Sequence, residues 1–134
     1  MQTNGQSQQA ALIAEDEPPL RRVLSKKISE LGCQVLTASD GEETLALIAK
    51  HHPQIILLDI IMPKKNGFDV LKEIRANHDE TTVIIISNLE HPDDKSMGQN
   101  YGVKDYILKS NISMRELAAK VKVLLDTDLH KKTA

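Results

Sequence analysis

Two hydrophobic patterns alternate along the chain. Short apolar runs are typical of strands inside a sheet, whereas longer segments with apolar residues three or four positions apart are typical of amphipathic helices. The short runs predict five strands, at 10–15, 34–38, 54–59, 81–87 and 104–109. The longer segments predict five helices, at 18–32, 39–52, 67–77, 92–101 and 113–125.

Residues that start or stop helices support several of these boundaries. The pair Pro18–Pro19 suits a first helical turn, and Gly32 suits a helix end. Ser113–Glu116 has the spacing of a capping box. The helix at 92–101 has the weakest pattern, because it is polar and Gly98 interrupts it.

The arrangement of the strands follows from their composition. Strands 54–59 and 81–87 are apolar on both faces, so helices must cover both sides of a parallel sheet. The five strand–helix units fill residues 10–125 and predict one α/β domain, a doubly wound (βα)5 sheet of flavodoxin-like order 2-1-3-4-5. We expect the polar residues 1–9 to form a disordered lead-in and 126–134 to form a polar tail that frays.

Composition narrows the classes of function. The 134 residues are 40% hydrophobic, enough for one core, and their net charge of −2 gives no sign of a nucleic-acid partner. A single cysteine excludes a disulfide framework or a cysteine-based zinc site. Neither a membrane-length apolar run of about 20 residues nor a secretory signal is present, so we expect a cytoplasmic setting.

Polar residues follow four of the predicted strands. They are Glu15, Asp16 and Glu17, then Asp59, then Ser87 and Asn88, and finally Lys109 and Ser110. Ligands of open α/β sheets bind beyond the carboxyl ends of the strands, so Asp16 and Asp59 should face each other, with Ser87 and Lys109 converging on them. Carboxylates that lie close together repel each other or bind a hard cation such as Mg²⁺.

This set of side chains has a chemical meaning. Aspartate is a nucleophile toward phosphoryl groups and forms an acyl phosphate. The Lys109 charge and the Ser87 hydroxyl both suit the oxygens of a transferring phosphoryl group. We therefore expect the carboxylate in "IILLDIIMP", Asp59, to face a polar cleft and not the hydrophobic core.

Four segments together resemble one known family. They are "LIAEDEP" (12–18), "LLDIIMPKKNGFDVL" (57–71), "IIIS" (84–87) and "GVKDYILKS" (102–110). Their order and spacing are similar to those of CheY-like receiver domains of two-component response regulators, over about residues 10–125. The resemblance implies a signalling switch, activated by phosphorylation, that is not an enzyme with its own turnover.

The resemblance also implies a role for each site residue. Asp59 would be the phosphoacceptor. Mg²⁺, which Mn²⁺ could replace, would bind Asp16, Asp59, the backbone carbonyl of Ile61 and, through a water, Glu15. The phosphoryl group would contact Ser87, Lys109 and Asn88, and Tyr106 would be an aromatic switch residue.

Three positions depart from the family pattern. Glu15 stands where an aspartate is frequent and has a longer reach. Asn88 stands where a small residue is usual, which would alter the access of water to the phosphate. Ser110 replaces a proline that commonly follows the lysine in a cis bond, so we expect a trans Lys109–Ser110 bond and an altered loop.

The implied partners are proteins. A sensor histidine kinase or a histidine phosphotransfer protein would supply the phosphoryl group. The face formed by helix 92–101, strand 104–109 and helix 113–125 would then bind a downstream protein or a second copy of the chain. Neither nucleic acid nor a membrane is expected as a partner. The chain would be a single-domain regulator or a receiver module of a larger regulator or hybrid kinase.

Other interpretations remain open at this point. A phosphatase of the haloacid-dehalogenase type also uses an aspartate nucleophile, but it needs a second aspartate where Ile61 stands. A flavodoxin-like carrier would need a Ser/Thr-rich loop in place of the acidic "EDEP". An inactive receiver would only bind a protein. Glu17 is expected to be solvated surface, and Tyr106 could be an ordinary strand aromatic.

Overall fold

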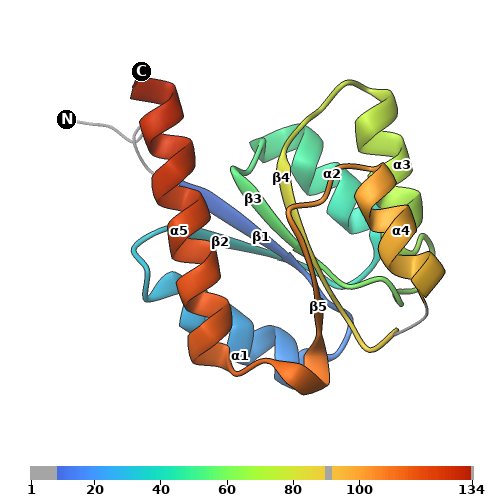
Figure 1. The fold of residues 1–134 in the computed structure, drawn as a ribbon, viewed down its shortest axis with the longest axis horizontal. Coiled ribbons are helices and arrows are strands. Elements are labelled where there is room, and N and C mark those ends of the chain that lie inside the picture. The colour runs from blue at the N-terminus through green and yellow to red at the C-terminus, as the bar shows by residue number, and fades with distance from the viewer. Residues whose placement is uncertain (1–8, 90–91, 134) are drawn as a thin grey trace.

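A five-stranded parallel sheet forms the centre of the molecule (Figure 1). The computed structural model describes residues 9–89 and 92–133, so most of the predicted lead-in, and Ala134 of the predicted tail, lie outside the described residues. The strands are β1 (Ala10–Ala14), β2 (Gln34–Ala38), β3 (Ile55–Leu58), β4 (Thr82–Ser87) and β5 (Asp105–Leu108). Their spatial order, β2-β1-β3-β4-β5, is the predicted one.

Helices cover both faces of this sheet (Figure 1). They are α1 (Pro18–Ser29), α2 (Gly41–His51), α3 (Gly67–Ala76), α4 (Pro92–Asn100) and α5 (Met114–Thr133), with a short 3-10 turn at Lys109–Asn111. The side chains of α1 and α5 pack in one hydrophobic cluster with one face of the sheet. Those of α2 and α3 pack in a second cluster with the other face.

The two clusters explain why the central strands lack polar positions. Ile55 and Leu57 of β3 belong to the cluster under α1 and α5, whereas Ile56 and Leu58 belong to the cluster under α2 and α3. Successive side chains of a strand point to opposite faces, so both sets are buried. The prediction of a sheet covered on both sides is therefore confirmed.

Local capping fixes where most helices begin. The side chain of Asp40 accepts a hydrogen bond from the backbone of Glu43 at 2.7 Å at the start of α2. The predicted box at Ser113–Glu116 is present, with reciprocal hydrogen bonds of 3.2 and 3.1 Å. Each cap satisfies backbone N–H groups that have no partner within the helix.

The helix α5 is longer than predicted. It continues through the polar residues to Thr133, although the sequence pattern placed its end at Leu125 and a fraying tail beyond. No Gly or Pro interrupts these residues, and Lys122 pairs with Asp126 at 3.2 Å along the helix. The predicted apolar stripe ends at Leu125, but each further residue of a helix that is already formed adds a backbone hydrogen bond.

The weak helix at 92–101 is present as α4, and Gly98 has a packing role in it. A Cβ atom added at Gly98 would lie 3.2 Å from Cδ1 of Ile85 and 3.3 Å from a Val103 methyl group. The glycine therefore lets α4 approach the sheet closely. After α4 the chain is held by Arg75 of α3, whose guanidinium donates to the carbonyls of Tyr101 and Asp79, each at 2.7 Å.

Two further expectations concern the backbone and the membrane. The described chain contains no cis peptide bond, so the Lys109–Ser110 bond is trans as expected. The loop there tightens into the 3-10 turn at Lys109–Asn111. Within the described residues, every helix is too short or too polar to cross a membrane.

Gly67, at the first position of α3, gives a test of how tightly the loop after β3 is packed. A Cβ atom at Gly67 would lie 2.5 Å from the Asp59 carbonyl oxygen and 2.9 Å from Cα of Ile60. We expect Gly67→Ala to lower the free energy of unfolding by about 1–3 kcal/mol, because backbone atoms must move to admit the methyl group.

Urea denaturation measures this change, and Gly98→Ala is the control. The atoms near Gly98 are ends of side chains that can shift, and alanine favours the helix. The control should change stability by less than about 1 kcal/mol. Equal losses in the two variants would show that the contact with the Asp59 carbonyl is not tight.

Candidate functional site

The strand register places two acidic residues side by side at the carboxyl edge of the sheet. Ala14 of β1 pairs with Leu58 of β3, and the residues that follow them are Glu15 and Asp59. The backbone N–H of Asp59 also donates to the Ala14 carbonyl at 2.9 Å. Both side chains are almost completely buried, with 2% of Glu15 and 4% of Asp59 exposed.

The amine of Lys109 lies between these carboxylates. Its Nζ atom is 3.0 Å from Oε1 of Glu15 and 3.3 Å from Oδ2 of Asp59. It is also 3.2 Å from Oε2 of Glu17, whose side chain is 62% exposed. The side chain of Lys109 itself is only 12% exposed, so one buried cation holds three carboxylates from the ends of two strands.

This arrangement moves the pKa values of both buried partners. Burial, and then the charge of Glu15, raise the pKa of Asp59 to about 7, against the opposing effect of Lys109. Burial alone would lower the pKa of Lys109, but its hydrogen bond to Glu15 and the charge of Asp59 outweigh this effect and raise it. Lys109 therefore stays positively charged at neutral pH. Asp59, in contrast, gains or loses its proton near pH 7.

Asp16 lies in the same acidic group. Glu15, Asp16 and Glu17 each offer a carboxylate oxygen, and these atoms lie within 4.8 Å of one another. Asp16 is half-buried at the turn into α1. Carboxylate oxygens are the ligands that Mg²⁺ prefers, so the donor chemistry of this group fits the predicted ion.

The backbone of the loop after Asp59 lies against the Asp59 carboxylate. The Ile61 N–H donates to Oδ1 of Asp59 at 3.4 Å. Ile60 and Met62 point into the core, with exposed fractions of 3% and 7%, whereas 58% of Ile61 is exposed. The loop thus leaves an apolar side chain on the surface, two residues after Asp59.

Ser87 and Tyr106 are joined by hydrogen bonds on the neighbouring strands. Ser87, at the end of β4, is completely buried, and its Oγ accepts from the Leu89 N–H at 3.1 Å. The Tyr106 hydroxyl donates to the Leu89 carbonyl, also at 3.1 Å. Burial raises the pKa of the Tyr106 hydroxyl. Asn88, which follows Ser87 in the sequence, is exposed.

One residue of the site differs from what the sequence indicated. Glu17 is exposed, as expected, but it also forms an ion pair with Lys109 and so is more than solvated surface. The contact depends on the backbone conformation where β1 leads into α1, which the sequence pattern does not reveal. Residues two apart in an extended segment point to the same side, and the backbone of Glu17 is extended (φ −84°, ψ 112°), which lets it join Glu15.

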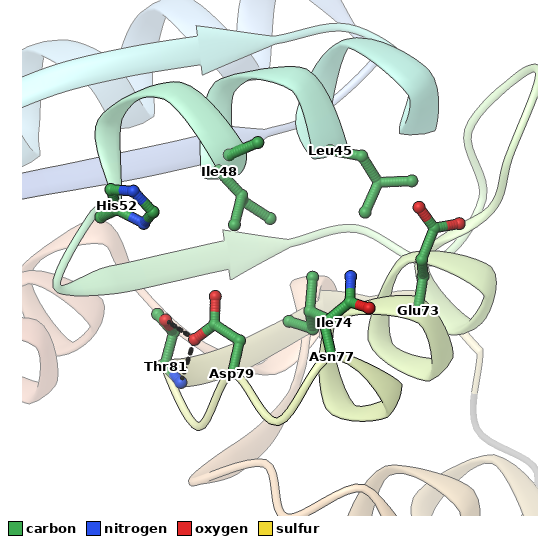
Figure 2. Close-up of a pocket in the computed structure, with 9 residues that line it drawn as sticks. Leu45, Ile48, His52, Glu73, Ile74, Asn77, Asp79 and Thr81 are labelled. Carbon is green, nitrogen blue, oxygen red and sulfur yellow. Dashed lines mark hydrogen bonds between the residues drawn. The ribbon is translucent and has the colours of Figure 1, made fainter.

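A separate pocket lies at the opposite edge of the sheet. It has a volume of about 460 Å³ between α2 and α3, and its apolar wall includes Leu45, Ile48 and Ile74. Figure 2 shows Asp79 and Thr81 at its rim, where they hydrogen-bond to each other just before β4 begins. None of the residues that line it is Glu15, Asp16, Asp59, Ser87 or Lys109.

Comparison with known proteins identifies the family. The family model of the response regulator receiver domain matches residues 11–122. The chain is 40% identical over 114 residues to "Probable transcriptional regulator ycf27" of Galdieria sulphuraria, covering 85% of this chain and 44% of that protein. It is 38% identical over 114 residues to "Transcriptional regulatory protein CpxR" of Klebsiella pneumoniae, covering 85% and 48%.

A solved structure agrees with these relatives. The receiver domain of the Francisella response regulator 1452 superposes with a TM-score of 0.83 at 32% identity, over 90% of this chain and 98% of that one. The chain spans about half the length of the curated relatives it matches. Fold, strand order and sequence agree, and the chain belongs to the response regulator receiver domain family.

Proposed function

We propose that the chain is a signalling switch that accepts a phosphoryl group on Asp59 from a phosphohistidine of a sensor kinase or phosphotransfer protein. The observation that carries this proposal is the buried ion pair of Asp59 and Lys109, 3.3 Å apart. A buried carboxylate beside a fixed cation is a poor element of a hydrophobic core, but it suits a nucleophile whose product carries more negative charge.

The proposed transfer uses one carboxylate oxygen of Asp59. That oxygen attacks phosphorus, a P–O bond forms, and the P–N bond of the phosphohistidine breaks, with its electron pair returning to the imidazole nitrogen. Lys109 offsets the charge that gathers on the phosphoryl oxygens. The exposed Ile61 offers the donor protein an apolar contact beside the acceptor.

Two residues of the acidic group, together with Asp59 and the loop that follows it, would hold a magnesium ion for this step. We assign Asp16, Asp59 and the backbone carbonyl of Ile61 as direct ligands and Glu15 as a ligand through water, and Mn²⁺ suits the same oxygen atoms. When bound, the ion offsets the repulsion between the acceptor carboxylate and the incoming phosphoryl group. Two observations support this assignment: carboxylate oxygens of Glu15 and Asp16 lie within 4.8 Å of each other, and Asp59 shares the Lys109 amine with Glu15.

Magnesium should also stabilise the folded protein. We expect millimolar Mg²⁺ to raise the melting temperature, because the ion binds the folded acidic group and not the unfolded chain. Asp59→Ala should remove most of that gain. Thermal denaturation with and without Mg²⁺ measures both effects. If Mg²⁺ raises the melting temperature of the variant as much as that of the wild type, Asp59 is not a ligand of the ion.

The response to phosphorylation would pass through Ser87 and Tyr106. A phosphoryl group on Asp59 would draw the Ser87 hydroxyl and the Lys109 amine toward its oxygens. Ser87 now accepts a hydrogen bond from the Leu89 N–H, and the Leu89 carbonyl accepts one from Tyr106, so displacement of Ser87 changes the contacts that position both. The face of α4, β5 and α5 would then present a different surface to a downstream protein or a second copy of the chain.

The relatives bear on the wider context of the domain. They are named as transcriptional regulators, and the chain matches less than half of each. The absence of a nucleic-acid partner expected from the charge therefore applies to the receiver domain alone. In a cytoplasmic setting the domain would act alone or as a module of a longer regulator.

Intact-mass spectrometry tests the proposed function directly. After incubation with a small acyl phosphate and Mg²⁺, the protein should gain the mass of one phosphoryl group. Gel filtration of the same sample would show whether the modification changes its assembly. A protein that gains no mass, or that turns over many equivalents of a phosphomonoester as a phosphatase would, contradicts the proposal.

A further inference from the structure

We infer that Glu17 is a positioning residue that holds the Lys109 amine before phosphorylation and releases it to the phosphoryl group. The inference rests on the proposed function and adds a competitor for Lys109 to it. Its basis is the ion pair of the exposed Glu17 with Lys109, at 3.2 Å.

The hydrogen-bonding capacity of Lys109 is already full. A protonated lysine amine has three N–H donors and no acceptor. Glu15, Glu17 and Asp59 each place a carboxylate oxygen 3.0–3.3 Å from Nζ. Phosphorylation leaves the Asp59 carboxyl uncharged, so its contact with the amine passes to one phosphoryl oxygen. A second phosphoryl oxygen can accept from this amine only if Glu15 or Glu17 gives up its own hydrogen bond.

Burial decides which partner leaves. Removing the amine from Glu15 would strand a charge that is 2% exposed, which is strongly unfavourable. Glu17 is 62% exposed, so water replaces the lost contact at little cost. Glu17 is therefore the partner that the phosphoryl group displaces.

The backbone holds Glu17 ready in this place. Glu17 precedes α1, and its N–H donates to Oε2 of Glu15 at 3.1 Å. Its carbonyl accepts from the Arg21 N–H at 2.9 Å, while the Arg21 guanidinium donates to the Glu15 carbonyl at 2.8 Å. Glu15 and Glu17 are thus fixed relative to each other, and the side chain of Glu17 needs only to rotate away.

The test measures the affinity of the protein for beryllofluoride, an analogue of the phosphoryl group, at saturating Mg²⁺. Three variants are compared with the wild type. Glu17→Gln removes the charge, and Glu17→Asp keeps the charge but shortens the reach. Glu30→Gln makes the same charge change at the other end of α1, where Glu30 pairs with Lys27 at 3.8 Å.

We expect Glu17→Gln to bind beryllofluoride about two- to five-fold more tightly, the range that follows from loss of one exposed ion pair. Glu17→Asp should bind more tightly as well, because the shorter side chain loses the contact. Glu30→Gln should bind like the wild type, and the melting temperatures of all three variants should stay close to that of the wild type.

Three results would overturn the inference or its foundation, and they can be told apart. If Glu17→Gln binds no more tightly than Glu30→Gln, Glu17 does not compete for Lys109. If Glu17→Asp binds like the wild type while Glu17→Gln binds more tightly, only the general charge matters and not the contact. If the wild type neither binds beryllofluoride nor gains a phosphoryl group, the proposed function fails first.

Discussion

Asp59→Asn is expected to abolish phosphoryl uptake and, at pH 8, to make the protein more stable. The amide cannot act as the acceptor, so the mass gain seen with an acyl phosphate and Mg²⁺ should vanish completely. The same change removes a carboxylate that is 4% exposed and lies beside Glu15. At pH 8 the gain in the free energy of unfolding should be about 2–4 kcal/mol.

The direction of the pH dependence follows from the raised pKa. The folded protein holds the Asp59 proton up to a pKa of about 7, whereas the unfolded chain releases it near 3.8. The wild type therefore loses stability as the pH rises between these two values, and the asparagine variant lacks that loss. The stabilisation should be largest at pH 8 and small at pH 4.

Urea denaturation at several pH values measures this window, and Asp105→Asn is the control. Asp105 is 39% exposed and pairs with Lys120 on the surface, so its change should stay within about 1 kcal/mol. If the Asp59→Asn variant still gains a phosphoryl group, the phosphoacceptor is a different residue. A stabilisation of equal size at pH 4 and pH 8 would show that the ionised carboxylate is not the source.

Lys109→Met is expected to be the most destabilising of the proposed substitutions. Methionine fills a similar volume but leaves Glu15 and Asp59 buried without a cation. Breaking a buried ion pair by removing one partner costs about 3–5 kcal/mol. The loss should be smaller at pH 5, where Asp59 takes up a proton, and the double variant with Asp59→Asn should recover part of it.

Lys120→Met is the matched control for this prediction. Lys120 lies 3.0 Å from Asp105, the same distance as Lys109 from Glu15, but its side chain is 49% exposed. Water solvates both groups after the substitution, so the loss should not exceed about 1 kcal/mol. If the two methionine variants lose equal stability, the Lys109 charge does not stabilise Glu15 and Asp59 more than a surface ion pair would.

The fold was predictable because hydrophobic patterns determine it almost completely. β3 and β4 are apolar at every central position, and this could only mean a sheet covered on both sides. The end of α5 was not predictable from that pattern, because the helix continues to Thr133, beyond Leu125, the last residue of the predicted apolar stripe. Gly98 gave a misleading signal as well, since its missing side chain matters only where α4 packs on Ile85.

The location of the site was predictable from the sequence, but most of the contacts between its residues were not. Strand order alone brings Asp59, Glu15 and Lys109 to one edge, because polar residues at the ends of parallel strands meet there. The ion pair of Glu17 depends on the turn that leads into α1, and three adjacent acids do not reveal which of them reach the amine. The link between Ser87 and Tyr106 runs through the backbone of Leu89, which side-chain patterns do not show.

The hydrogen bonds of Arg75 constrain how α4 can move. They fasten the carbonyl of Tyr101, just beyond the last turn of α4, to the end of α3. Any rearrangement of α4 that preserves these bonds must be a rotation about its C-terminal end, and not a translation along the sheet. The largest travel would then fall on the first turn of α4, next to the loop that carries Leu89.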